Sequence, residues 1–295
     1  ANRLEYPVLV RPSYVIGGRA MEVVYKDSEL EEYMIKALKA AQSQAILIDK
    51  YVFGKEAEVD AISDGETVIM PGVMEHIERS GVHSGDSIAV YPTRTISEKA
   101  LSKIEDYSIK IAKSLEVKGL LNIQYIVNND NVYVIEVNPR SSRTIPYLSK
   151  ITDIPMVKLA TLAMLGKKLS DMGYTDGIIK RKDFYAVKVP VFSFSKLEMV
   201  DAHLGPEMKS TGEVLGIDKN YYKALYKGFI GAGLELPQEG SILATIADKD
   251  KEEILPYIKE FAKLGFKIYA TSGTAKFLSD NDIECERVNK ISEGW

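Results

Sequence analysis

Residues 123–140 contain two runs of strand-forming residues around an Asn- and Asp-rich turn, and this pattern constrains the fold more than any other part of the chain. The runs are 123–127 (IQYIV) and 132–137 (VYVIEV), and 128–131 (NNDN) separates them. Val, Ile and Tyr favour strands, whereas Asn and Asp favour tight turns. The pattern predicts a β-hairpin. Because side chains alternate between the two faces of a strand, Glu136 and Asn138 share one face.

The length of the hairpin loop decides which side chain lies opposite Glu136. A three-residue loop, 129–131, pairs residue 128 with residue 132 and places Gln124 directly opposite Glu136. A two-residue loop would instead place Gln124 opposite Ile135, on the wrong face. We therefore predict the three-residue loop, because it gathers one carboxylate and two amide oxygens at one point.

Carboxylate and amide oxygens are ligands that Mg²⁺ and Mn²⁺ prefer. Arg140 and Arg143 follow directly, and guanidinium groups suit phosphate oxygens. The pattern therefore predicts a nucleotide–metal site built on Gln124, Glu136 and Asn138. An ordinary exposed hairpin face would show the same spacing and stays open as an alternative.

Bulk composition narrows the class of protein. The 295 residues allow one large domain or two ordinary ones, and a net charge of −4 argues against a nucleic-acid-binding surface. The single cysteine, Cys285, excludes an internal disulfide and a multi-cysteine zinc site and fits a reducing cytoplasm. No apolar run reaches the roughly 18–20 residues of a spanning helix, so we expect a cytoplasmic protein without membrane contacts. The strand-like run that begins at residue 8 indicates a fragment.

Periodicity and turn residues predict the remaining elements up to residue 168. Ser28, with Glu31 three residues later, predicts a capping box at the start of a helix. The stretch 12–21, with Gly17 and Gly18, reads as a tight connection or as a phosphate-binding loop. We expect strands over 7–11, 22–25, 46–51, 57–63 and 67–74, and helices over 28–41, 97–115 and 155–165.

The polar stretch 75–86 follows the strand expected over 67–74 and contains two of the three histidines. The spacing of these histidines does not match a zinc motif. We expect a loop here. It is either simply solvated, or it contacts a nucleotide or a small acid.

A different pattern begins near residue 240. A strand over 241–247, an amphipathic helix over 249–264, a strand over 266–270 and a helix opened by 271–274 (TSGT) are expected. This order suggests a doubly wound α/β module with anion-binding potential at its strand ends. A plain helix N-cap at Thr271 is the alternative, and the basic residues of 249–263 read as a solvated helix face.

Five motifs taken in order resemble one family, the large chain of carbamoyl-phosphate synthase, which is an ATP-grasp enzyme. They are 10–21 (VRPSYVIGGRAM), 74–78 (MEHIE), 81–87 (GVHSGDS), 135–140 (IEVNPR) and 204–214 (LGPEMKSTGEV). The segments GGRAM and MEHIE are similar to the C-terminal half of that chain, which phosphorylates carbamate. The tail from about Leu234 resembles the methylglyoxal-synthase-like allosteric domain, which follows only this half.

The resemblance implies an α/β and α+β architecture. It places a partial ATP-grasp domain at 1–168, the remainder of the synthetic region and a connection at 169–233, and an incomplete methylglyoxal-synthase-like, doubly wound α/β domain at 234–295. Relative to the family, the chain is expected to lack the preceding nucleotide-fold region, the bicarbonate-activating half and the end of the allosteric domain.

The resemblance also implies roles for matching positions. Arg11 would contact the ATP phosphates, and Asp49, Lys50, Val52 and Glu56 would line the adenine and ribose pocket. Gly81, Val82, His83 and Ser84 would form the nucleotide-side loop. Gln124, Glu136 and Asn138 would hold the metals, while Arg140 and Arg143 face the transferred phosphoryl group and act with Asn138 in catalysis.

Two effector sites are implied as well. Lys251, Thr271, Thr274 and Lys290 would belong to an allosteric phosphate site for a nucleotide such as UMP. Glu78 and Asp86 match acids that the family uses for ornithine. A third acid expected beside Lys188 is replaced by Val189, which argues against ornithine control.

The implied activity is ATP-dependent phosphorylation of carbamate to carbamoyl phosphate, for pyrimidine and arginine biosynthesis. The implied cofactors are ATP and two Mg²⁺ or Mn²⁺ ions per site, with K⁺ as a further candidate. The implied partners are a glutaminase small subunit and the bicarbonate-phosphorylating half, and a homo-oligomer is open. Two rivals remain: another ATP-grasp carboxylate–amine ligase, and a non-catalytic nucleotide-binding regulatory fragment.

Overall fold

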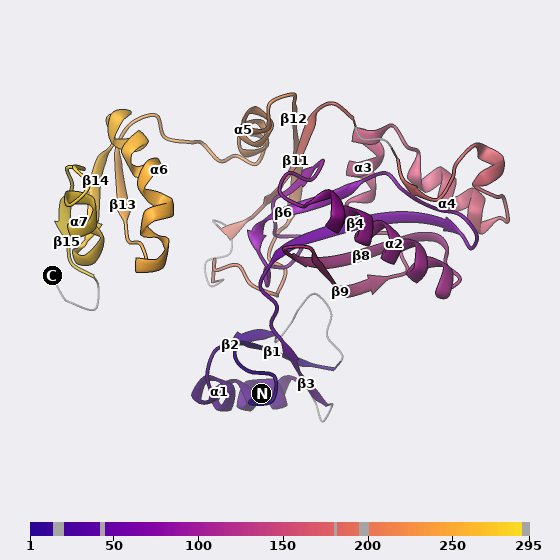
Figure 1. The fold of residues 1–295 in the computed structure, drawn as a ribbon, viewed down its shortest axis with the longest axis horizontal. Helices are drawn as coiled ribbons and strands as arrows, with labels where there is room; N and C mark the ends of the chain where they lie inside the picture. Colours follow the sequence, from indigo (N-terminus) through magenta and orange to yellow (C-terminus); the bar gives the residue numbers. More distant parts are fainter. Residues whose placement is uncertain (14–20, 42–44, 180–181, 195–200, 291–295) are drawn as a thin grey trace. The chain divides into compact units, whose positions relative to one another are not determined.

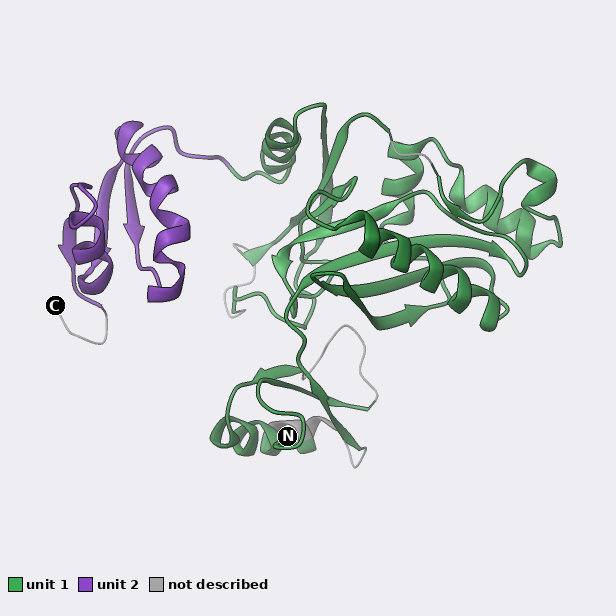
Figure 2. Ribbon diagram, viewed as in Figure 1, with its two compact units in different colours: residues 1–234 green, residues 235–295 purple. Residues whose placement is uncertain are grey.

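The computed structural model describes residues 1–13, 21–41, 45–179, 182–194 and 201–290. The chain divides into two compact units, residues 1–234 and 235–295, which Figure 2 shows in different colours. Each unit has hydrophobic clusters of its own. Within the described ranges, no helix combines the length and the apolar character needed to cross a bilayer.

The first unit begins with a small antiparallel sheet of strand order β2-β1-β3. Its core contains Val8, Val10 and Val24, together with Tyr33 from the helix α1. The glycine-bearing loop expected over 12–21 lies mostly outside the described residues, at 14–20. The elements are β1 (Val8–Pro12), β2 (Glu22–Val24), α1 (Asp27–Ala41) and β3 (Ile46–Lys50).

The predicted start of α1 was wrong in detail. The helix begins at Asp27, and the Glu29 carboxylate accepts a hydrogen bond of 3.0 Å from the backbone N–H of Tyr25. This bond ties the residues before the helix to its first turn, and Ser28 lies inside the helix and not at the predicted N-cap position.

A nine-stranded sheet forms the body of the first unit (Figure 1). The long strand β4 lies at its centre and pairs with β5 and β6 on one side and with β8 on the other. The strands are β4 (Lys55–Asp64), β5 (Val68–Met70), β6 (Val73–Arg79), β7 (Ala89–Tyr91), β8 (Lys118–Asn128), β9 (Asn131–Asn138), β10 (Gly177–Ile178), β11 (Tyr185–Val191) and β12 (Gly212–Asp218).

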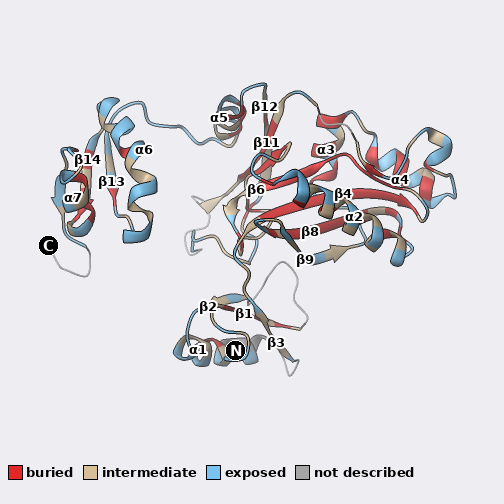
Figure 3. Ribbon diagram, in the orientation of Figure 1, coloured by how far each residue is buried: buried red, intermediate tan, exposed pale blue. Residues whose placement is uncertain are grey.

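Helices cover both faces of this sheet. On one face α2 packs against the odd-numbered apolar residues of β4, such as Val59 and Ala61. On the other face α3 and α4 pack over Ile62 and Ile69, and the buried strands appear red in Figure 3. The helix α5 packs against β11 and β12. The helices are α2 (Glu98–Ser114), α3 (Ile145–Thr152), α4 (Met156–Met164), the 3₁₀ turn η1 (Ser170–Met172) and α5 (Tyr221–Gly231).

The strand expected over 67–74 is divided in the structure. Pro71 and Gly72 end β5 and separate it from β6, because proline has no N–H group to donate to the ladder. A Cβ atom at Gly72 would lie 2.3 Å from a ring atom of Tyr91, so only glycine fits. The loop expected over 75–86 was therefore wrong in its first part, since residues 75–79 continue β6.

The β8–β9 hairpin corrects the predicted loop and keeps the predicted pairing. Asn128 pairs with Asn131, so the loop has two residues and not three. The register then shifts between Gln124 and Tyr125, where Ile135 forms a β-bulge, and Gln124 lies opposite Glu136 as expected. A bulge adds one residue to one strand and so restores the face that the shorter loop would have lost.

The second unit is a parallel sheet of strand order β13-β14-β15. The expected order of strand, helix, strand and helix is confirmed, although the first strand ends at Ala244 and a 3₁₀ turn precedes the first helix. The elements are β13 (Ser241–Ala244), η3 (Asp248–Asp250), α6 (Lys251–Lys263), β14 (Lys267–Thr271), α7 (Ser272–Ser279) and β15 (Glu286–Val288).

Candidate active site and effector pocket

Two rows of polar side chains cross the strands β4, β8 and β9. In the first row Glu58 pairs with Gln124, which pairs with Glu136. In the second row Asp60 pairs with Asn122, which pairs with Asn138. Directly opposed residues of antiparallel strands lie on the same face, so the six side chains form one polar surface of the sheet. Its inner part, Glu58, Asp60 and Asn122, is buried, and its outer part is accessible.

The outer part of this surface suits a divalent metal. Glu136 is exposed, and in the described part of the chain its carboxylate makes no side-chain hydrogen bond or ion pair. Gln124 donates from Nε2 to Ser84 Oγ at 3.1 Å, which leaves its carbonyl oxygen as a ligand. No group of three or more His, Cys, Asp or Glu side chains is placed to hold a metal among the described residues. The fit therefore rests on one carboxylate with two amides, a donor set that Mg²⁺ accepts.

The loop 80–88 is tied to the strand residues expected to line the nucleotide pocket. Glu56 accepts a 3.0 Å hydrogen bond from the backbone N–H of Gly81, which adopts φ 100°, a conformation that favours glycine. Ser80 Oγ donates to the carbonyl of Val52 at 3.0 Å, and the hydroxyl of Tyr51 also hydrogen-bonds to Ser80. The structure thus brings 51–52, Glu56 and Gly81 together.

The small sheet carries the other nucleotide-side candidates. Arg11 and Asp49 form an ion pair of 2.8 Å across the paired strands β1 and β3. Lys50 points elsewhere and donates to the backbone carbonyl of Glu5 at 2.9 Å. Arg11 and Asp49 therefore form one polar pair, whereas Lys50 is separate from it.

His83 lies close to the metal-candidate residues. Burial lowers its pKa, while the charges of Asp86 and Glu136 act in the opposite direction. Its Nδ1 accepts the backbone N–H of Gly85 at 3.0 Å, and its own backbone N–H donates to Gly205 at 2.8 Å. Val82 is half-buried beside it in the same loop.

The two acids expected to bind an effector have structural partners. Asp86 is fully buried, and its two carboxylate oxygens accept 2.8 Å hydrogen bonds from the backbone N–H groups of Lys209 and Ser210. Glu78 accepts from the backbone N–H of Ile88 at 2.8 Å, and burial raises its pKa.

Lys188 and Val189 face opposite sides of β11. Lys188 donates to the carbonyl of Ser84 at 3.0 Å, whereas Val189 packs under α5 against Gly228. The position where a third acid was expected therefore lies in an apolar core.

Sequence reasoning missed the group of ionisable side chains at the buried end of the polar surface. His76 lies between Glu56 and Glu58, with nitrogen–oxygen distances of 3.3 and 3.4 Å. Burial alone would lower the pKa of His76, but the hydrogen bonds to both glutamates raise it to about 9. Burial and the neighbouring Glu58 raise the pKa of Asp60 to about 7. The sequence does carry a signal for this group, because acidic residues occupy every second position, 56, 58 and 60, between apolar residues of the expected strand.

Arg140 and Arg143 lie on the exposed segment between β9 and α3. The backbone N–H of Arg140 donates to Asn138 at 2.7 Å, and Arg143 Nη1 contacts Met208 Sδ at 3.2 Å. A Cβ at Gly85 would lie 3.3 Å from the Arg143 guanidinium, which brings this arginine next to the loop 80–88. Together these groups form a surface able to hold a metal-bound polyphosphate.

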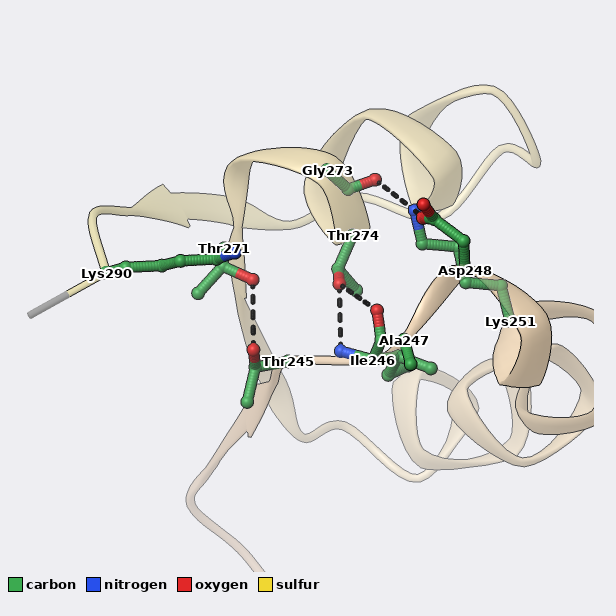
Figure 4. Close-up of a pocket in the computed structure, with 9 residues that line it drawn as sticks. All are labelled: Thr245, Ile246, Ala247, Asp248, Lys251, Thr271, Gly273, Thr274 and Lys290. Carbon is green, nitrogen blue, oxygen red and sulfur yellow. Dashed lines mark hydrogen bonds and ion pairs between the residues drawn. The ribbon is translucent and has the colours of Figure 1, made fainter. Parts of the chain in front are cut away.

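The four residues predicted for a phosphate site in the second unit line one cavity of about 260 Å³. Figure 4 shows Lys290 at one end and Lys251 at the other, with the threonines between them. Thr274 Oγ1 accepts from the backbone N–H of Ile246 at 3.0 Å, and Lys251 donates to the Gly273 carbonyl at 2.9 Å. The lining residues are Thr245, Ile246, Ala247, Asp248, Lys251, Thr271, Gly273, Thr274 and Lys290.

Comparison with known proteins gives two family matches. Residues 1–172 match the model of the carbamoyl-phosphate synthase L chain, ATP binding domain, and residues 253–295 match that of the MGS-like domain. The first matched region contains the candidate active-site residues from Arg11 to Arg143. The second contains the cavity residues Thr271, Gly273, Thr274 and Lys290, whereas Lys251 lies before its start.

Solved structures share the fold at low sequence identity. One is the biotin carboxylase domain of 2-oxoglutarate carboxylase from Hydrogenobacter thermophilus, in complex with MgADP, ADP and bicarbonate (22% identity, TM-score 0.55, 67% of this chain and 44% of that chain). Others are biotin carboxylase from Campylobacter jejuni (20%, 0.52, 65% and 43%) and an ADP complex of purK, N5-carboxyaminoimidazole ribonucleotide synthetase (18%, 0.58, 79% and 62%). The chain therefore spans between 43% and 62% of these relatives.

Proposed function

Because the chain belongs to the family of the carbamoyl-phosphate synthase L chain, ATP binding domain, we propose that its first unit transfers the γ-phosphoryl group of ATP to carbamate. The products are carbamoyl phosphate and ADP. The observation that carries this proposal is the register of β8 and β9, in which Gln124 faces Glu136 and Asn122 faces Asn138 beside two exposed arginines. The ATP-grasp fold that the chain shares with ATP- and ADP-bound relatives supports it.

In this proposal the nucleotide lies between the small sheet and the loop 80–88. Arg11 contacts its phosphates, while Asp49, Val52 and Glu56 form the wall for the adenine and ribose. The backbone N–H groups and side chains of 81–84 complete that wall. The hydrogen bonds from Ser80 to Val52 and from Gly81 to Glu56 support this placement, because they hold the loop against the strand residues.

Phosphoryl transfer depends on positioning and on neutralising charge more than on covalent help from the protein. Gln124, Glu136 and Asn138 would hold Mg²⁺ or Mn²⁺, which supplies positive charge to the β- and γ-phosphates. Arg140 and Arg143 stabilise the oxygens of the transferred group. The carbamate oxygen attacks the γ-phosphorus in line with the departing ADP oxygen, and the γ-phosphoryl bond to ADP breaks as the new P–O bond forms.

The finer parts of the proposal concern supply and control. Carbamate decomposes in water, so the site should be closed and should receive carbamate by an internal route from a bicarbonate-phosphorylating half. A glutaminase subunit would supply the ammonia. The cavity in the second unit supports an anionic effector such as UMP, because two lysines and two threonines line it. K⁺ binding, a cytoplasmic location and roles in pyrimidine and arginine biosynthesis belong to the same proposal.

A second candidate is another ATP-grasp ligation, in which an acyl phosphate is attacked by an amine. The fold shared with biotin carboxylases and with purK favours it, since those enzymes use the same architecture. The second unit argues for the first candidate, because its MGS-like match accompanies the carbamate-phosphorylating half in the resemblance described above.

The decisive assay measures Mg²⁺-dependent formation of ATP from ADP and carbamoyl phosphate. We expect Glu136→Ala and Arg140→Ala to lower kcat about 10²-fold or more, because each removes a group that stabilises charge at the phosphoryl group. Asp106→Ala, at an exposed position on α2, is the matched control and should retain full activity.

No ATP formation, either by this chain or after addition of the family's bicarbonate-phosphorylating half, would contradict the proposal. Nucleotide binding without turnover would favour the regulatory reading. Phosphate release that depends on bicarbonate and an amine acceptor, without carbamoyl phosphate, would favour the second candidate.

A further inference from the structure

The two arginines of the candidate active site have few side-chain constraints of their own. Arg140 Nη1 donates to the neighbouring carbonyl of Ser141 at 3.0 Å, and Arg143 contacts the sulfur of Met208. Within the described ranges neither guanidinium forms an ion pair. Their placement therefore depends on how the segment 139–144, here named the arginine loop, is attached to the rest of the fold.

Buried carboxylates on β4 make that attachment, chiefly Asp60, because Glu58 accepts only one long bond of 3.4 Å from Thr144 Oγ1. Asp60 Oδ1 accepts from Ser142 Oγ at 2.6 Å, and Asp60 Oδ2 accepts from Thr144 Oγ1. Asn122 Nδ2 donates to Oδ1 at 3.0 Å from the neighbouring strand. The hydroxyl oxygens of Ser142 and Thr144 also lie 2.8 Å apart. These two hydroxyls of the arginine loop therefore meet at Asp60.

Packing does not account for an acid at this position. Asp60 is 0% exposed, and the next residue on its face, Ile62, belongs to the apolar core under α3 and α4. Burying a carboxylate costs free energy unless several donors satisfy it. Two of the three hydrogen-bond donors to Asp60 come from the arginine loop. We therefore attribute the buried carboxylate to the attachment of this loop.

We propose that Asp60 is a positioning residue for phosphoryl transfer, which holds the arginine loop so that Arg140 and Arg143 face the transferred group. This inference rests on the proposed function and deepens it. Asp60 is fully buried, so in this inference it acts through Ser142 and Thr144 and not by contact with the nucleotide. The central strand thereby fixes a surface segment whose guanidinium groups must be in place before the reaction begins.

The kinetic test uses Asp60→Asn in the assay of ATP formation. The amide keeps the size of the side chain but directs N–H groups at hydroxyl donors, so the loop should shift. We expect kcat to fall about 10²-fold, as for a displacement of about 1 Å, while the KM for MgADP changes less than about twofold. The nucleotide wall lies on other elements, 49–56 and 81–84, which is the reason for this split.

Two variants control for a loss of stability. Asp64→Asn changes another buried acid of β4, which accepts from the backbone N–H groups of Glu66, Thr67 and Leu169 and not from the arginine loop. It should lower the free energy of unfolding and leave kcat within about twofold. Ser142→Ala removes one hydrogen bond to Asp60 by changing its half-buried partner in the loop. The loss of kcat should be smaller than for Asp60→Asn, and in the double variant the two losses should not add.

A second readout does not require activity. Trypsin cleaves after Arg140 and Arg143, so we expect Asp60→Asn to raise the cleavage rate at these two bonds at least tenfold, with faster amide exchange over 139–144. Asp64→Asn should not raise cleavage there selectively. Unchanged cleavage and exchange in Asp60→Asn, or a kcat within twofold of the parent, would overturn the inference. If the parent chain forms no ATP, the proposed function fails, and the cleavage and exchange rates still decide whether Asp60 holds the loop.

Discussion

At the scale of single residues, the sheet separates accessible candidate ligands from buried charged groups. Glu136 and Asn138 are accessible at the outer strand, whereas Glu58 and Asp60 are buried at the central one. His76 lies between two glutamates, and a charged imidazolium explains how the carboxylates tolerate burial. The two rows therefore combine a charged, buried interior with an accessible edge that carries the candidate metal ligands.

The raised pKa of His76 makes stability depend on pH. Its folded pKa is about 9, above the ordinary value of 6.5, so the folded state holds the proton more tightly. This stabilisation is fully present below pH 6.5 and is lost as the pH rises through 9. The free energy of unfolding should fall by on the order of 3 kcal/mol across that range. The acids that face His76 are Glu56 and Glu58, with Glu78 and Lys188 nearby.

Urea unfolding between pH 7.5 and 9 measures this effect. Asp60, with its pKa raised to about 7, loses its contribution mainly between its ordinary pKa of 3.8 and 7, below that window. His76→Gln should flatten the dependence, and His203→Gln, at an exposed position, should not. A parent protein whose stability is constant from pH 7.5 to 9 would show that His76 is neutral.

At the scale of elements, long periodic segments were predictable and interruptions of strands were not. The helix over 97–115 matches α2, and its N-cap Ser97 accepts from Ala100, because the cap and the apolar spacing are local signals. The break at Pro71 and Gly72 depends on Tyr91, which is distant in sequence. The bulge at Ile135 depends on pairing across two strands. Both features depend on contacts between residues that are distant in sequence, so a short stretch of sequence does not predict them.

The break between β5 and β6 gives a test at this scale. Gly72→Ala places a methyl group against the Tyr91 ring, and we expect a loss of about 1–3 kcal/mol in the free energy of unfolding. Gly205→Ala is the matched control, because no atom lies within 4 Å of its Cβ position. Thermal unfolding of the two variants compares them directly, and equal midpoints would contradict the account of the break.

At the scale of the whole chain, sequence reasoning named the residues of both candidate sites but not the buried residues that hold the first one in place. Gln124, Glu136 and Asn138 followed from strand alternation, and the residues for the effector site followed from the resemblance; four of these line one cavity. Glu58, Asp60 and His76 were missed, because their partners come from β6, β8 and the arginine loop. Such networks become visible only when the sheet order is known.

The cavity in the second unit supplies a prediction about control. Lys251→Gln should weaken UMP binding about tenfold, since a charge-assisted contact to phosphate is worth roughly 1.5 kcal/mol or more, and it should leave kcat without effector unchanged. Lys259→Gln, on the exposed side of the same helix, is the matched control. Calorimetric titration with UMP measures both, and equal affinities in the two variants would exclude Lys251 from the site.

The bulge at Ile135 sets a parity rule for how this hairpin can change length in evolution. A turn with one residue more would keep Gln124 opposite Glu136 only if the bulge disappeared at the same time. Insertions and deletions here are therefore tolerated in compensating pairs, one at the tip and one in the returning strand. Related chains whose turn length differs by one residue should accordingly differ by one residue between positions 132 and 136. An alignment that gaps only the turn would place Glu136 and Asn138 on the wrong face.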